Sequence, residues 1–515
     1  MSYSSIRGIA VAVLMCLPAR VFPQSSVTLA AAREGQRVIE QMIAAVGGRD
    51  ALRSIRTIVS DESIRRSSLG QALNPRAPAV VQGRRTVWYD VAGQRINELR
   101  ILDITGNQLW DVQRFITRNA GTVVSWSSMT KDSMPVASLP SQRAGFARRN
   151  LLPFLMSIER RSPDAMRSLG TMTVGGRAQD VVAITDVDGV QLTLIVDKQT
   201  HLPTRIEQLA ITAAMGDTVD VLTFSDYRKV GPLLLPHRRD EVRSNETEWE
   251  YRVERFEIDT PIADTMFAVP AGLTQVTTPL TSMVKLASDV YLVPGGYQSV
   301  FVVFDDYVLV LEAGAGQGRN IIARVREVAP GKPIRYVVAT HFHEDHLAGL
   351  RPFIAEGTTI VTTADAKGRI EALARTRSRL APDTLDRAPR APVIEVVEKQ
   401  RTFKDARHEV QLHQVGPNAH VDQILVGYLP AERILFEGDL LDMPNGGEPA
   451  AGGDDTADFA RKVRALGLAF DRLIPVHGEP GTAADLEKSL RRGLARAKCP
   501  LGAERRTPCW VDERN

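Results

Sequence analysis

The stretch THFHEDHLAG, residues 340–349, places three of the protein's 9 histidines and one aspartate within six consecutive positions. A lone histidine is usually a structural residue, whereas imidazoles gathered this closely are mostly uncharged at neutral pH and bind zinc well. The preceding run IRYVVAT (334–340) is β-branched and predicts a buried strand. The run HLAGLRPFIAE (346–356) has apolar residues at helical spacing, so the cluster lies where a strand meets a helix.

The spacing inside this stretch predicts two neighbouring metal positions. Alternate residues of an extended chain point the same way, so His341 and His343 can bind one ion. Asp345 and His346 fall where the helix begins and the chain turns, so their side chains can face a second ion beside the first. We therefore interpret the motif as a two-metal site.

Length and composition restrict the class of protein. The chain has 515 residues, enough for two or three domains of ordinary size. A hydrophobic content of 43% and a charged content of 24% are typical of a soluble globular protein. The net charge of +3 is too small to indicate a nucleic-acid partner, so we expect a small-molecule substrate.

Residues 1–24 have the pattern of a cleavable secretory signal. Arg7 supplies a positive charge, and residues 9–17 form an apolar run too short to be a stable membrane anchor. Small and polar residues follow, and no other apolar run is long enough to cross a bilayer. We therefore expect a periplasmic or secreted protein.

The 3 cysteines agree with export. Cys16 leaves with the signal, whereas Cys499 and Cys509 lie in the C-terminal tail, residues 497–515. In an oxidising compartment these two would close a small loop, so we predict a disulfide between them.

The segment 25–275 predicts an accessory α+β domain with a curved antiparallel sheet. Residues 29–48 have the apolar face of a helix, and residues 141–161 predict a second helix. Between and after them, runs such as DVVAITDVDGVQLTLIVD (180–197) alternate apolar and polar residues. The stretch ALNPRAPAVVQG (72–83) predicts a mobile loop.

In pattern rather than in motif, this segment resembles periplasmic lipoprotein-carrier domains. The similar stretches are VIEQMIAAVGGRDALRSIRTI, LIVDKQTHLPTRIE and FSDYRKVGPLLLPHR. Those domains are open half-barrels that hold an apolar ligand, so the resemblance implies an apolar or lipid-like ligand. A scaffold sheet that binds nothing is the alternative.

The segment 284–496 predicts a layered α/β domain, because strands and helices alternate along it. Further metal ligands occur there in order: His420 ahead of a strand, Asp439 at the end of the next strand and His477 at the end of a later one. In layered α/β folds, strand ends are where ligands tend to bind. Together with the first cluster, these residues make a complete two-metal set.

The set resembles the metallo-β-lactamase-fold hydrolase superfamily over about residues 286–490, with its H-x-H-x-D-H signature at 341–346. The resemblance implies an αββα sandwich. It also implies that His341, His343 and His420 hold one metal. Asp345, His346 and His477 would hold the other, and Asp439 would bridge the two. Glu312 departs from the family, many of whose members have Asp at this position; a longer carboxylate could still orient a ligand.

The chemistry of such a site predicts an exported hydrolase of esters, lactones or amides. Two adjacent dications activate a hydroxide and polarise the substrate, and Asp345 would serve as ligand and as the catalytic orienter of the nucleophile. We expect two Zn²⁺ ions per chain, with iron and manganese as alternatives. A β-lactamase, a phosphodiesterase, and a carrier protein with a structural or sensory metal domain remain alternative functions.

Overall fold

The computed structural model describes residues 26–68, 70–76, 79–104, 108–119, 122–125, 129–132, 136–212, 214–244, 246–268, 274–275, 282–441, 443 and 449–496. The predicted signal (1–24), the tail (497–515) and the predicted disulfide of Cys499 and Cys509 lie outside these residues. Within these ranges, the helices are all too short or too polar to cross a membrane. The boundaries at 275 and 284 stay predictions.

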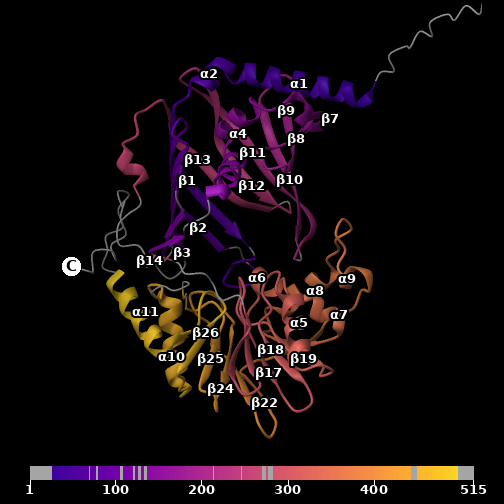
Figure 1. The fold of residues 1–515 in the computed structure, drawn as a ribbon, viewed down its shortest axis with the longest axis vertical. Coiled ribbons are helices and arrows are strands. Elements are labelled where there is room, and N and C mark those ends of the chain that lie inside the picture. Colours follow the sequence, from indigo (N-terminus) through magenta and orange to yellow (C-terminus); the bar gives the residue numbers. More distant parts are fainter. Residues whose placement is uncertain are drawn as a thin grey trace, which may run out of the picture.

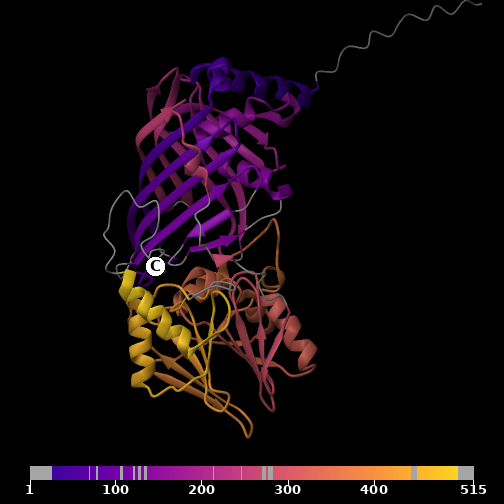
Figure 2. The same ribbon diagram turned by 60° about the vertical axis from the view of Figure 1, so that its left-hand side comes forward.

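The N-terminal part of the chain forms one large antiparallel sheet, as the alternating runs predict. In spatial order its strands are β4 (Gln108–Ile116), β3 (Arg95–Ile104), β2 (Ala79–Asp90), β1 (Thr57–Ser68), β13 (Glu246–Ile258), β12 (Leu233–Arg243), β11 (Gly216–Val230), β10 (Pro203–Thr212), β9 (Gln191–Asp197), β8 (Arg177–Thr185) and β7 (Met166–Val174). A small sheet joins β14 (Thr274–Gln275), β6 (Met129–Asp132) and β5 (Thr122–Ser125). The large sheet is curved, and its strands run obliquely (Figure 2).

Helix α1 (Val27–Ala45) crosses one end of this sheet (Figure 1). Its apolar face, which includes Val38 and Met42, packs into the domain core with residues of the sheet. Two residues after the helix, Gly47 has φ +130°, and a Cβ there would lie 2.6 Å from the carbonyl oxygen of Pro232. Only glycine fits this turn, which leads into the short helix α2 (Arg49–Ser54).

The helix predicted over 141–161 is two helices, α3 (Leu139–Arg148) and α4 (Leu151–Ile158). The break falls at Asn150, whose backbone is extended. Its side-chain oxygen accepts hydrogen bonds from Arg85 at 2.8 Å and Arg239 at 3.1 Å, and its amide donates to the carbonyl of Phe146. This polar anchoring interrupts the helical hydrogen bonds, which apolar periodicity alone does not reveal.

The C-terminal part is a sandwich of two sheets. The first contains β15 (Val284–Ala287), β16 (Val290–Val293), β17 (Ser299–Val303), β18 (Val308–Leu311), β19 (Ile334–Val338), β20 (Thr359–Thr362) and β21 (Val393–Val396). The second contains β22 (Gln400–Lys404), β23 (Glu409–Gln414), β24 (Leu425–Leu429), β25 (Ile434–Glu437), β26 (Arg472–Pro475) and β27 (Gly481–Thr482). The helices are α5 (Gly318–Val328), α6 (Glu344–Leu347), α7 (Arg351–Glu356), α8 (Lys367–Arg375), α9 (Thr384–Arg387), α10 (Asp454–Ala465) and α11 (Ala483–Arg496).

The layers follow the predicted αββα order. Residues from both sheets, among them Leu309 and Phe436, meet in one buried core between them. Helices flank the pair of sheets, with α5 and α7 on one side and α10 and α11 on the other (Figure 1). The helix predicted over 346–356 is again split, into α6 and α7, because Gly349 packs against the backbone of Ala313 and Pro352 begins a new helix.

Candidate metal centre

The structure brings all seven predicted ligands together at strand ends. His341 follows β19, Asp439 follows β25 and His477 follows β26, and the strands β18 and β19, like β25 and β26, run parallel. The seven form two groups: His341, His343, His420 and Asp439; and Asp345, His346, Asp439 and His477. In each group the potential ligand atoms lie within 4.8 Å of one another. Asp439 belongs to both groups, as a bridging residue must.

The distances around Asp439 fit a shared carboxylate. Its Oδ1 lies 3.0 Å from His477 Nε2, and its Oδ2 lies 3.1 Å from His346 Nε2 and 3.4 Å from His420 Nε2. The Nε2 atoms of His420 and His341 face each other at 3.3 Å. Side chains from separate segments of the C-terminal domain thus converge on one small volume.

Several of these buried atoms lack a hydrogen-bond partner among the described residues. They are His343 Nδ1, His346 Nε2 and Asp439 Oδ1; the close contacts of His346 Nε2 and Asp439 Oδ1 with neighbouring ligand atoms do not have hydrogen-bond geometry. Buried polar atoms in folded proteins are nearly always paired, so orphaned donors and acceptors that converge need another partner. Imidazole nitrogens with carboxylate oxygens are the donor set that zinc prefers. The residues therefore fit the expected metal.

The pKa values of the predicted ligands are shifted in different directions in the two donor groups. Burial, together with neighbouring histidines, lowers the pKa of His341 and of His343 well below the usual value, so both present lone pairs. Burial also opposes protonation of His346, but the carboxylates of Asp439 and Glu312 outweigh it and raise its pKa. Burial acts to raise the pKa of Asp439, yet the adjacent His346 outweighs it and keeps that pKa well below its usual value.

Glu312 orients ligands in both groups. The residue is fully buried, has φ +71° and follows β18. Its Oε2 accepts from His346 Nδ1 at 3.3 Å and from the hydroxyl of Thr340 at 2.6 Å. The Thr340 hydroxyl oxygen in turn lies 3.1 Å from His341 Nδ1. These contacts leave Nε2 of each histidine facing the centre. Glu312 thus has the ligand-orienting role that the sequence left open.

We expect Glu312→Gln to lower metal affinity about 10- to 100-fold, the usual cost of losing an outer-sphere partner. The substitution keeps the side-chain shape but removes the charge that holds His346. Competition with a chromogenic chelator measures the affinity. Glu356→Gln, which removes a surface ion pair with Arg326, is the matched control and should leave the affinity unchanged. An unchanged affinity in Glu312→Gln would contradict the orienting role.

Sequence reasoning missed Tyr297. Its ring lies edge-on to those of His477 and His346, with centroids 5.0 Å and 5.9 Å away. Burial and the nearby carboxylate of Asp345 raise the pKa of its hydroxyl, so the phenol stays protonated and can donate a hydrogen bond. The two glycines before it mark a tight turn, but nothing in the stretch PGGYQS identifies the tyrosine as part of the site.

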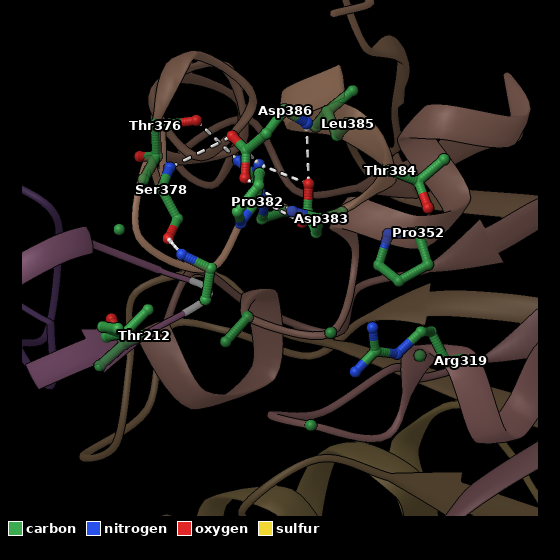
Figure 3. A pocket seen from close by; sticks show the side chains of 18 of the residues that line it. Thr212, Arg319, Pro352, Thr376, Ser378, Pro382, Asp383, Thr384, Leu385 and Asp386 are labelled. Carbon is green, nitrogen blue, oxygen red and sulfur yellow. Dashed lines mark hydrogen bonds and ion pairs between the residues drawn. The ribbon is translucent and has the colours of Figure 1, made fainter. Parts of the chain in front are cut away.

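Four further histidines and one cavity contribute no residue to the two donor groups. His201, His237, His408 and His413, which we interpret as structural or surface residues, belong to neither donor group. The glycine-rich stretch MPNGGEPAAGGDDT (443–456), which could border the site as a lid or serve only as a connector, lies outside the described residues at 444–448. A cavity of about 500 Å³ has Thr212, Arg319 and Asp383 among its lining residues and contains none of the seven ligands (Figure 3).

Comparison with known proteins defines the class. The model of the metallo-β-lactamase superfamily matches residues 292–479, which include the seven ligands. The C-terminal domain is therefore a metallo-β-lactamase-fold domain. The match does not extend into the N-terminal sheet domain that precedes it.

Similar solved structures are metallo-β-lactamases. The one from Pontibacter korlensis is 20% identical, with a TM-score of 0.31, over 41% of this chain and 98% of that chain. DIM-1 is 16% identical, with a TM-score of 0.32, over 42% and 98%. FIM-1 from Pseudomonas aeruginosa, in its mono-zinc form, is 17% identical, with a TM-score of 0.32, over 42% and 96%. No curated protein matches the chain.

Proposed function

We propose that this protein is an exported binuclear zinc hydrolase that cleaves an ester, lactone or amide bond. The observation that carries the proposal is the pair of donor groups that share Asp439. A purely structural zinc site needs four closed ligands around one ion, whereas here seven residues surround two positions. The superfamily match of residues 292–479 supports hydrolysis as the reaction class. Export is proposed on the N-terminal signal pattern alone.

The two bound ions would supply an activated water and a Lewis acid for the substrate oxygen. The chain supplies their spacing and the orientation of the reacting groups. Asp439 sets the distance between the two positions, because its carboxylate faces His346 and His477 of one group and His420 of the other. Asp345 Oδ2 lies 3.6 Å from His346 Nε2 and 3.8 Å from His477 Nε2, so this carboxylate can hold a proton-bearing nucleophile beside the second position.

The bridging aspartate supports the substrate class. In the superfamily, an Asp at this position is typical of thioesterases, lactonases, phosphodiesterases and nucleases, whereas many β-lactamases carry Cys or Ser. The modest net charge of +3 argues against a nucleic-acid substrate. The protonated hydroxyl of Tyr297 provides a donor for a substrate carbonyl or leaving group, which suits acyl transfer.

Metal removal tests the proposal directly. Protein purified without chelators should contain two zinc ions per chain by mass spectrometry of the metals. Dialysis against a chelator should abolish hydrolysis, and two equivalents of Zn²⁺ should restore it, because both donor groups are needed for the reaction. Full activity with a single ion bound would contradict the two-metal proposal.

A substrate panel distinguishes the alternatives. We expect turnover of esters, lactones or amides to exceed that of a β-lactam and of a phosphodiester. Preferred turnover of either of the last two would identify the protein as a β-lactamase or a phosphodiesterase. Two bound zinc ions without turnover of any member would favour a carrier or sensor.

A further inference from the structure

We infer that the loop between β1 and β2 of the N-terminal domain is an outer part of the metal centre. Its described residues, 70–76, orient one ligand of each donor group, His343 and Asp345. The inference rests on the proposed function, since it presupposes metals at both groups. It assigns the N-terminal domain a role in metal affinity and turnover, although the described residues of that domain belong to neither donor group.

The first contact selects the tautomer of His343. The backbone carbonyl oxygen of Ala72 lies 2.9 Å from His343 Nε2. A carbonyl oxygen can only accept, so Nε2 carries the hydrogen and donates it. The other ring nitrogen, Nδ1, is buried without a hydrogen-bond partner and keeps its lone pair. Ala72 thereby directs His343 to bind metal through Nδ1.

The second contact fixes the carboxylate of Asp345. The side-chain amide of Gln71 donates to Asp345 Oδ1 at 2.6 Å. The opposite oxygen, Oδ2, faces His346 and His477, the other ligands of the second group. Gln71 therefore satisfies the outward oxygen and prevents rotation of the carboxylate, so one defined oxygen remains for the metal.

Backbone hydrogen bonds hold this loop in register with the ligand-bearing segments. The amide of Glu344 donates to the carbonyl of Gly70 at 3.1 Å, and the amide of Asp422 donates to the carbonyl of Leu73 at 2.8 Å. Glu344 lies between His343 and Asp345 in the chain. Each of the four residues 70–73 thus bonds to a segment that carries predicted ligands.

The β1–β2 loop packs closely against the C-terminal domain. A Cβ on Gly70 would lie 3.0 Å from Glu344 Oε2, and Ala72, only 1% exposed, packs in the hydrophobic core of the C-terminal domain. The β1–β2 pairing stops at Ser68 and Ala79, so the connection is longer than the 2–5 residues usual in hairpins. The mobile loop predicted over 72–83 is wrong in two parts: residues 70–73 are hydrogen-bonded to the other domain, and residues 79–83 belong to β2.

A second contact between the domains supports this placement. Asp217, at the start of β11, accepts from the Ser378 hydroxyl at 2.8 Å and from the Arg379 amide at 2.8 Å. Gly216 has φ +70°, and a Cβ there would lie 2.3 Å from the carbonyl oxygen of Arg377. The domains therefore meet closely at two separate places, which limits their relative rotation and keeps the loop at the metal centre.

The test compares Gln71→Met with Arg76→Gln in the full-length protein. Methionine has nearly the length of glutamine but no donor, so Gln71→Met removes the bond to Asp345 and little volume. Arg76 lies on the same loop with an exposed side chain, which makes its substitution the matched control. Gln71→Glu, of the same shape as glutamine, places a second carboxylate against Asp345 and serves as an independent variant.

The readouts are zinc affinity by chelator competition and melting temperature with and without zinc. We expect both Gln71 variants to bind the more weakly held zinc about 10- to 100-fold less tightly than the parent. The metal-free melting temperature of Gln71→Met should match that of the parent, while the rise on adding zinc should shrink. A merely structural role would instead lower the metal-free melting temperature and leave affinity unchanged.

The outcomes separate this inference from the proposed function. If the parent binds two zinc ions and the Gln71 variants bind them as tightly, the loop has no outer-sphere role and the proposed function stands. If the parent binds no zinc, both are overturned. Equal weakening in Arg76→Gln would also overturn the inference, because it would reflect disturbance of the loop as a whole and not loss of one hydrogen bond.

Discussion

Asp439→Ala should lower the turnover rate constant by at least ~100-fold, the scale seen when a preorganised electrostatic element is lost. The carboxylate contacts His346 and His477 of one donor group and His420 of the other. Without it, the two positions lose their common ligand, and their spacing is no longer fixed. The first group keeps three histidines, so one ion should stay bound while the second is weakened.

Metal content and turnover, measured with a thermal melt, check this expectation. The fold should survive, because the side chain lies at the loop after β25 and not in an apolar core. Asp471→Ala removes the same atoms from a surface ion pair with Arg433 and is the matched control. Near-normal turnover in an Asp439→Ala variant that melts cooperatively would mean that Asp439 is no bridge, and the two-metal proposal would fall.

Arg85→Leu should destabilise the N-terminal domain by about 3–5 kcal/mol, the range for breaking a buried ion pair. Arg85 is 1% exposed and binds both oxygens of Glu62 at 2.8 Å and Glu98 at 3.1 Å. Its removal leaves carboxylates in the domain interior with fewer donors. Arg255→Leu, which breaks an exposed pair with Asp61, should cost no more than about 1 kcal/mol.

The stability that Glu62 and Glu98 contribute through Arg85 should depend on pH with a definite sign. Burial acts to raise the pKa of Glu62 and of Glu98, but neighbouring arginines, Arg85 foremost, outweigh it and lower both pKa values. In the parent, this stabilisation is present above the unfolded pKa of about 4.3 and is lost as the pH falls through the lower folded values.

Without Arg85, the largest attraction that offsets burial is lost, so the folded carboxylates should bind protons more tightly in the variant than in the parent. Protonation at lower pH then relieves more of the cost of burying these carboxylates in the variant than in the parent, so the variant's stability deficit should be smaller at pH 5 than at pH 7. Denaturant unfolding at both pH values measures this. An equal deficit at both would show that lost packing, and not unpaired charge, is the cause.

The predicted ligand positions depend on local chemistry, and this is why they can be read from the chain. An H-x-H-x-D-H spacing across a strand and a helix start sets the relative directions of its side chains, whatever surrounds them. His420, Asp439 and His477 could be added because strands of a layered α/β domain end at a common edge. The alternating runs likewise predict the antiparallel sheet, whose face periodicity is local. An apolar ligand for that sheet stays a prediction.

Other features required the tertiary structure. The helix break at Asn150 depends on Arg85 and Arg239, which arrive from β2 and β12, so helical periodicity does not show it. Glu312 stood out as a departure from the family, but its hydrogen bond to His346 became visible only when β18 and β19 were paired.

The positions of the seven predicted ligands and the αββα domain around them were determined by the sequence itself, because strand and helix geometry dictates where side chains at given spacings point. The contribution of the N-terminal domain to the site was decided only by the tertiary structure. Ala72 contributes a backbone carbonyl, which every residue type has, and so leaves no mark in the sequence. Gln71 acts through one amide whose partner lies 274 positions away, a contact that exists only because the two domains pack in one orientation.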